Sequence, residues 1–154
     1  MIYHDSFEEE LSQGDILQEV RILVDVEGIE NNQPQYDNSS VIILSRNCEI
    51  SKPARAGNSI LVARVIPLAL APKDKQGNIR SKGTVNTYYL PAYENLIDEC
   101  FIDWRTFQPV HKSYLYWLRA NRLNYRCTLN KEQIKLCLGG FIWFLTKPDD
   151  EENN

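Results

Sequence analysis

The stretch Leu44 to Ile50, LSRNCEI, combines side chains that can carry out nucleophilic chemistry. Cys48 stands two residues after an arginine, and a nearby guanidinium lowers the pKa of a thiol and so activates it, provided that a base takes the proton. The only histidine in the body of the chain is His111, so a Cys48-dependent hydrolase would pair these two residues. The structural alternative is a small cysteine that fills the corner where a strand ends.

A second candidate site lies in FIDWRTF, where Asp103 and Arg105 stand two positions apart and therefore share one face of a strand. Together with Arg46 or Arg64 they would bind an anion or a substrate. The structural alternative is a carboxylate–guanidinium pair on the sheet, which stabilises a protein little when it is exposed. The candidate catalytic residues are therefore Cys48, Asp103, Arg105 and His111.

Arginines and aromatic side chains alternate in SYLYWLRANRLNYR, residues 113–126. Arginines neutralise phosphates and aromatic rings stack on unpaired bases, so this pattern indicates contact with single-stranded nucleic acid. The alternative is that the rings fill the core and the charges form a solvated face. The predicted nucleic-acid-binding residues are Arg46, Arg64, Arg80, Lys82, Arg119, Arg122 and Arg126.

The net charge of −4 conceals a separation of charge along the chain. Residues 1–40 carry ten acidic side chains and one basic side chain, whereas residues 41–147 carry sixteen basic and seven acidic ones. A basic body favours an anionic partner, and acidic ends that fold back onto it would neutralise it. The sequence leaves both interpretations open.

The sequence lacks the ligand spacing of a metal site and the motifs of a cofactor site. Its four cysteines include no C-x-x-C pair and it has two histidines, so we expect reduced cysteines and no metal. Gly-rich phosphate loops, H-E-x-x-H and G-x-S-x-G are absent, so no cofactor is expected. No run approaches the ~20 apolar residues of a membrane span, and the acidic start does not resemble a secretory signal. We therefore expect a cytoplasmic protein without membrane association.

Hydrophobic periodicity indicates which elements position these residues. Five apolar or alternating segments predict strands over residues 20–26, 40–45, 60–67, 85–93 and 100–110. Polar segments predict a short turn or helical piece over residues 5–15 and loops over residues 27–40, 46–59 and 71–84, the last a basic loop or hairpin tip.

A helical period follows the last predicted strand. We expect one helix over residues 113–123 and a final helix that Asn130 caps and Pro148 ends. The apolar side chains of this final helix fall on one face: Ile134, Cys137, Leu138, Phe141, Ile142 and Leu145. Gly139 and Gly140 each cost about 1 kcal/mol in mid-helix, so we expect that they allow a close approach to a sheet.

Several short strands followed by one or two helices define an α+β domain, most simply a small curled barrel that the C-terminal helix packs against. The length fits one domain, which we place over residues 1–147. Residues 148–154 are expected to form an acidic, disordered tail.

Three short segments, Gly14-Asp15-Ile16, Val41 to Ser45 and Val62 to Ile66, resemble the N-terminal half of the PemK/MazF toxins over roughly residues 13–68. Those toxins are SH3-like barrels that cut RNA. The resemblance implies an SH3-like barrel of five or six mostly antiparallel strands, a bacterial source, and a setting in genome defence or a toxin–antitoxin pair. Because toxin barrels commonly pair, it also implies a homodimer as a state to test.

The positions that match the catalytic residues of those toxins carry other side chains here. Ser39 matches the catalytic arginine, and Ile66 or Pro67 matches the catalytic threonine or serine. Cleavage at a 2′-hydroxyl needs a base and a cation. The resemblance therefore implies a relative that binds nucleic acid or a protein partner. The alternatives are an endoribonuclease with relocated catalytic residues and the Cys48-dependent hydrolase.

A second resemblance is carried by LSRNCEI together with FIDWRTFQPV. These segments look like those of small bacterial proteins in which a strand ends in S-x-x-C-D/E-I. The similarity extends over most of the chain, and it implies no particular activity.

Overall fold

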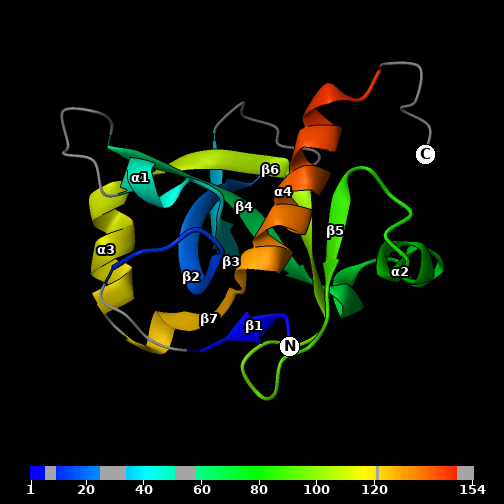
Figure 1. Ribbon diagram of the computed structural model, residues 1–154, viewed down its shortest axis with the longest axis horizontal. Helices are drawn as coiled ribbons and strands as arrows, with labels where there is room; N and C mark the ends of the chain where they lie inside the picture. Colours follow the sequence, from blue (N-terminus) through cyan, green and yellow to red (C-terminus); the bar gives the residue numbers. More distant parts are fainter. Residues whose placement is uncertain (6–9, 25–33, 51–57, 121, 149–154) are drawn as a thin grey trace.

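A computed structural model describes residues 1–5, 10–24, 34–50, 58–120 and 122–148. A single antiparallel sheet of seven strands curls into half a barrel in the strand order β1-β7-β2-β3-β4-β6-β5 (Figure 1). The strands are β1 (Tyr3–His4), β2 (Asp15–Val24), β3 (Gln35–Ile43), β4 (Ser59–Pro67), β5 (Thr87–Leu90), β6 (Cys100–His111) and β7 (Tyr125–Leu129). The helices are α1 (Asn47–Ile50), α2 (Lys73–Arg80), α3 (Lys112–Ala120) and α4 (Lys131–Thr146), with the 3₁₀ turns η2 (Leu68–Leu70) and η3 (Arg122–Asn124).

The predicted α+β class, the antiparallel sheet and the C-terminal helix are confirmed, but the sheet has seven strands rather than five or six. The two strands missing from the prediction are the short β1 and β7. They come from opposite ends of the chain and pair with each other, Tyr3 opposite Leu129. Among the described residues, no helix is long and apolar enough to span a membrane.

All three predicted loops are partly wrong, and the one over residues 46–59 contains α1 (Asn47–Ile50). Residues 35–40 belong to β3, because the polar side chains of this segment extend the hairpin with β2, where Val24 pairs with Gln35. Residues 73–80 form α2 rather than a hairpin tip. Asp74 in the first turn and Arg80 in the last turn of α2 suit the helix dipole, while Ile79 is the one side chain that α2 buries.

The predictions at the two ends of the chain lie partly outside the described residues. Of the predicted turn or helical piece over 5–15, the described part contains a turn, in which Asp15 N donates to Ser12 O at 3.0 Å. The described part of the predicted tail is Pro148 alone.

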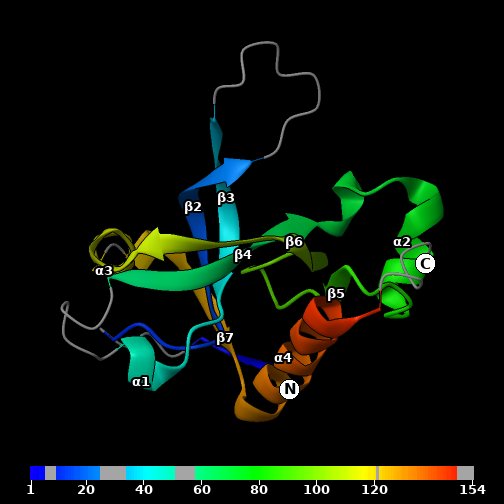
Figure 2. The ribbon, with the colours of Figure 1, turned by 90° about the horizontal axis from the view of Figure 1, so that it is seen from above.

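The sheet has an apolar cluster on each face. On one face, α4 covers a cluster centred on Trp104, whose ring centroid lies 5.0 Å from that of Phe141 (Figure 2). On the other face, α3 covers a cluster that includes Val62, Leu115 and Leu118. A smaller cluster of Leu68, Ile79 and Phe101 lies beneath α2. Helices therefore cover both faces of the sheet.

Helix α4 follows its predicted pattern. The side chain of Asn130 accepts a hydrogen bond from Gln133 N at 3.0 Å and caps the helix. A Cβ atom on Gly140 would lie 3.1 Å from the Tyr88 ring, so the predicted close approach to the sheet is confirmed there. A Cβ atom on Gly139 would have no neighbouring atom within 4 Å, so the close approach does not involve this residue.

Candidate functional site

A row of polar side chains crosses four neighbouring strands on one face of the sheet. We call these residues the polar row: Ser39 of β3, Arg64 of β4, Asp103 and Arg105 of β6, and Thr87 of β5. Both Arg64 and Thr87 are direct cross-strand neighbours of Asp103. Along β4, the row separates the cluster beneath α3 from the cluster beneath α2.

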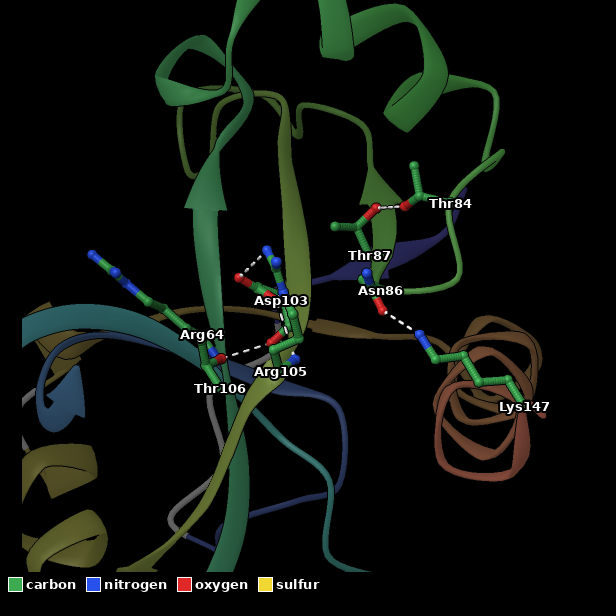
Figure 3. A network of polar contacts seen from close by, with 8 residues as sticks. All are labelled: Arg64, Thr84, Asn86, Thr87, Asp103, Arg105, Thr106 and Lys147. Carbon is green, nitrogen blue, oxygen red and sulfur yellow. Dashed lines mark hydrogen bonds and ion pairs between the residues drawn. The ribbon is translucent and has the colours of Figure 1, made fainter. Parts of the chain in front are cut away.

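An irregularity in β6 produces this arrangement. Arg64 pairs with Asp103 and Val62 pairs with Gln108, so several residues of β6 bulge out opposite the single residue between them on β4. The hydroxyl of Thr106 holds the bulge, since it donates to Asp103 O at 2.6 Å and accepts from Arg64 N at 2.9 Å. Bulges re-aim side chains next to binding sites, and here the bulge folds Arg105 back onto Asp103 (Figure 3).

Asp103 and Arg105 form a two-pronged ion pair. Arg105 Nε donates to Asp103 Oδ1 at 3.0 Å, and Arg105 Nη2 donates to Oδ2 at 3.2 Å. The hydrogen bond to Asp103 raises the pKa of Arg105 above its usual value. The Asp103 side chain is almost buried, whereas 62% of the Arg105 side chain is exposed. The carboxylate is thus a fixed anchor, and the guanidinium presents its outer side to solvent.

Arg64 adds a second guanidinium to the same face. Its Nε donates to Ser39 Oγ at 3.0 Å, across from β4 to β3. Of the two arginines suggested to join Asp103 and Arg105, Arg64 is the cross-strand partner of Asp103, whereas Arg46 pairs with Glu49.

A pocket of about 570 Å³ opens between α2 and the end of the polar row. Its apolar side is formed by Ile66, Ile79 and Phe101. Its polar side is formed by Lys75, Asn78, Thr84, Asn86, Thr87, Asp103 and Arg105. We call it the α2 pocket, and its volume lies in the range of small-molecule sites.

The polar wall of the α2 pocket is cross-linked. Thr84 and Thr87 share a hydrogen bond between their hydroxyl groups, and Lys147 Nζ donates to Asn86 Oδ1 at 3.0 Å from the end of α4 (Figure 3). Sequence reasoning missed Thr84, Asn86 and Thr87, because they belong to the pocket only through the position of α2. The spacing of residues in the sequence does not predict where α2 lies.

The other predicted nucleic-acid-binding residues do not join the polar row. Arg46 pairs with Glu49 at 3.0 Å on α1. Arg80 pairs with Glu99 at 2.7 Å, and Lys82 Nζ donates to the Tyr88 hydroxyl at 3.2 Å. The guanidinium of Arg126 donates to the side chain of Gln18.

The two remaining predicted nucleic-acid-binding residues are Arg119 in α3 and Arg122 in η3. Arg119 is buried beside Asp15, so the prediction that it contacts nucleic acid is wrong. The desolvation of a core arginine is tolerated here because a buried carboxylate faces it. Arg122 begins η3, and its side chain lies outside the part of the chain that the structure describes.

Cys48 and His111 are not brought together in the described part of the chain. Cys48 is exposed on α1 and lines a hollow with Glu10, Asn47, Lys112 and Tyr116, and His111 is not among the lining residues. His111 Nδ1 instead lies 2.8 Å from Ser113 Oγ. Among the described residues, His111 therefore does not line the hollow in which Cys48 lies.

Among the described residues, no group of cysteine, histidine and acidic side chains is placed to hold a metal ion. None of the four cysteines forms a disulfide. No protein-family model and no curated protein matches the chain.

Proposed function

We propose that the protein binds single-stranded nucleic acid across the polar row and the α2 pocket. The observation that carries this proposal is the bulge in β6, which sets Asp103 and Arg105 at the mouth of a pocket, one strand away from Arg64. The guanidinium groups of Arg64 and Arg105 can bind phosphates. The neighbouring pocket can bind a base, because Phe101 forms one side of it and amide and hydroxyl groups form the other.

The chemistry of the two parts is complementary. Arg64 and Arg105 neutralise backbone phosphates, since guanidinium groups bind phosphate oxygens with charge-assisted hydrogen bonds. An unpaired base enters the α2 pocket against Phe101, and Asn86 and Thr87 bond to its polar edge. Lys75 at the rim of the pocket adds a further positive charge. Duplex bases are stacked and paired, so a single strand is the preferred ligand.

We also propose that the sheet is an SH3-like barrel related to the PemK/MazF toxins. The three resembling segments fall at the start of β2, at the end of β3 and within β4, and these strands are neighbours in the sheet. The proposed setting in bacterial defence or a toxin–antitoxin pair rests on this relationship. A protein partner in such a pair would compete for the same basic surface.

One observation favours a second candidate, an endoribonuclease with relocated catalytic residues. The guanidinium of Arg64 lies next to Ser39, where the toxin family carries its catalytic arginine. Arg64 would then stabilise the charge of a pentavalent phosphate, and Asp103, its cross-strand partner, would take the proton of the 2′-hydroxyl. This candidate uses the same polar row as the binding function.

Binding is tested by fluorescence anisotropy with labelled single-stranded RNA and DNA at several salt concentrations. Affinity should fall as salt rises, and Arg64→Gln and Arg105→Gln should each weaken binding and reduce the slope of log K against log salt by about 1. Arg21→Gln removes the same charge from β2, where the exposed Arg21 is not a member of the row and lies over the Tyr36 ring, and should change neither. Equal affinities for Arg21→Gln and Arg105→Gln would exclude the polar row as the binding surface.

Cleavage is tested on the same RNA oligonucleotides after incubation and separation on a gel. The endoribonuclease candidate requires that the wild type cuts RNA but not DNA, since the attacking 2′-hydroxyl is absent from DNA. It also requires that Arg64→Gln and Asp103→Asn abolish cutting. Intact RNA at enzyme concentrations that saturate binding would leave the binding function alone.

A further inference from the structure

A hollow of about 250 Å³, which we call the Arg126 hollow, lies on the face of the sheet opposite the polar row. Its floor is formed by Ile16, Val65 and Cys100, which belong to the apolar cluster beneath α4. Polar side chains surround this floor: Gln18 of β2, Asp98 before β6 and Arg126 of β7. The volume equals that of roughly eight water molecules at about 30 Å³ each, so a ligand of this hollow is a small molecule.

A bulge in β7 places Arg126 at the hollow. Ile16 pairs with Cys127 and the next residue, Leu17, pairs with Tyr125, so Arg126 is an extra residue without a partner on β2. The residues on either side of it therefore face opposite ways, because Cys127 belongs to the cluster beneath α4 and Tyr125 to the cluster beneath α3. Bulges re-aim side chains next to binding sites.

A second bulge, in β2, brings Gln18 to the same hollow. Between Leu17 and Val20, both Gln18 and Glu19 stand opposite Ser40 alone, and Ser40 also lines the hollow. The φ angle of Glu19 is 59°, a left-handed conformation that is unfavourable for a residue with a side chain. Backbone strain of this kind is found most often at functional sites. The two bulges therefore mark this hollow as a binding site.

The side chain of Gln18 fixes the guanidinium of Arg126. Its oxygen accepts a hydrogen bond from Arg126, and its Nε2 donates to Leu123 O at 2.8 Å. The amide of Gln18 is thus held at both ends, and it orients the guanidinium before any ligand arrives. A guanidinium has five N–H donors, so this single bond leaves donors for a ligand.

Asp98 brings the opposite charge to the hollow from the segment before β6. Burial raises the pKa of the Cys100 thiol to about 12, and the charge of Asp98 adds to this rise, as expected for a carboxylate near the floor. Among the residues that the structure describes, neither Arg126 nor Asp98 takes part in an ion pair. The hollow therefore combines a cation, an anion and an apolar floor, and neither charge is neutralised by the protein.

We propose that the Arg126 hollow binds a free amino acid with an aliphatic side chain. The carboxylate of the ligand accepts charge-assisted hydrogen bonds from Arg126, and its ammonium group donates to Asp98. The aliphatic side chain lies on Ile16 and Val65, as expected for a small-molecule site with few polar groups over an apolar floor.

The two charges select a ligand that carries both signs. A simple carboxylic acid would place its anion near the carboxylate of Asp98, and a simple amine would place its cation near Arg126. Like charges brought together are unfavourable, so a zwitterion is the class of ligand that satisfies both walls. The hollow and the polar row lie on opposite faces of the sheet, so amino-acid binding and nucleic-acid binding can each fail without the other.

The experiment is isothermal titration calorimetry of the full chain with L-leucine, L-isoleucine, L-valine and L-methionine. At least one of them should bind with a dissociation constant of about 1 mM or lower. Arg126→Gln and Asp98→Asn should each raise this constant by about tenfold or more. The matched controls are Arg21→Gln and Asp37→Asn, which remove the same charges from exposed positions of β2 and β3. Both controls should bind like the wild type.

Analogues of the tightest ligand test the need for both charges. For L-leucine these are isocaproate, which lacks the ammonium group, and isoamylamine, which lacks the carboxylate. Each should bind about tenfold or more weakly than the amino acid. Circular dichroism checks that the variants are folded, and Asp98→Asn at an exposed position keeps the test decisive if Arg126→Gln disturbs β7.

Three outcomes would overturn the proposal. The first is that none of the four amino acids binds at concentrations up to about 10 mM. The second is that isocaproate binds as tightly as L-leucine, since the hollow would then be a site for simple anions. The third is that Asp98→Asn and Arg126→Gln both bind the amino acid like the wild type, since the ligand would then lie elsewhere on the protein.

Discussion

Arg119 Nε lies 3.4 Å from Asp15 Oδ2, and these two charged side chains are 2% and 1% exposed. Asp15 also accepts hydrogen bonds from Thr128 Oγ1 at 2.5 Å and from Ser12 N at 3.0 Å. The guanidinium carbon of Arg119 lies 4.1 Å from the centre of the Tyr125 ring. Burial raises the pKa of Asp15, while the bond from Thr128 and the charge of Arg119 oppose that rise. The pair joins β2, α3 and β7 at one point of the core.

Removing one member of this pair should be strongly destabilising. Arg119→Met leaves the Asp15 carboxylate buried without its cation, and we expect a loss of about 3–5 kcal/mol in the free energy of unfolding. Urea denaturation measures it. The control Arg46→Met removes an arginine from a solvent-exposed pair and should change stability by less than about 1 kcal/mol. A loss below about 1 kcal/mol for Arg119→Met would show that the pair is not buried in solution.

Gly14 should not tolerate a side chain. Its φ angle is +90°, and a Cβ atom would lie 2.8 Å from the side chain of Ile134 on α4. We expect Gly14→Ala to destabilise the protein by about 1–3 kcal/mol. Gly77→Ala in α2 meets no atom within 4 Å and should stabilise by up to about 1 kcal/mol. Thermal unfolding compares the two variants, and shifts of the same sign would contradict the expectation.

Glu99 should make the free energy of unfolding depend on pH below 4.5. Arg80 Nε and the Tyr89 hydroxyl each donate to Glu99 Oε1 at 2.7 Å. These bonds lower the pKa of Glu99 from 4.5 to about 2. A carboxyl with a lowered folded-state pKa contributes stability that is complete above pH 4.5 and is lost as pH falls toward 2.

Glu99→Gln should therefore flatten the dependence of the denaturation midpoint on pH between 4.5 and 2. Glu132→Gln on α4 serves as the control, because this carboxyl makes no such bonds in the described structure. Parallel profiles for the wild type and Glu99→Gln would mean that the carboxyl is not held by Arg80 and Tyr89.

The cysteines should divide into one reactive and three protected thiols. Cys48 is exposed, whereas burial raises the pKa of Cys100, Cys127 and Cys137 to about 12. A thiol reagent at pH 8 should modify one cysteine rapidly and the other three only in denaturant. Cys48→Ser should abolish the rapid phase, and Cys137→Ser should leave it intact. Two rapid phases in the wild type would mean that a core cysteine is accessible.

The elements that could be predicted from the sequence are those whose signals are local. The cap at Asn130 and the apolar spacing define α4, and the alternation from Cys100 onward defines β6; both are confirmed. β7 was missed because Tyr125–Leu129 is short and gains its partners only from β1 and β2, far away in sequence. Helix α2 was missed because it buries only Ile79, which leaves no apolar period to detect.

The candidate site could be predicted in part for the same reason. That Asp103 and Arg105 share a face follows from their spacing, and both lie in the polar row. The bulge depends on the hydroxyl of Thr106, which bridges two strands. No sequence pattern within β6 predicts this bulge. The misassignment of Arg119 arose because an arginine amid aromatic rings looks the same in sequence whether it faces phosphate or a buried carboxylate.

The pairing of β7 with β2 also sets a condition on synthesis. Asp15 leaves the ribosome well before Thr128 and Arg119, which surround its carboxylate, because Thr128 follows it by 113 residues. β1 likewise has no strand to pair with until β7 has been made. The nascent chain therefore cannot complete this edge of the sheet until residues 125–129 have been made, and a ribosome stalled before them would hold an open, unpaired strand.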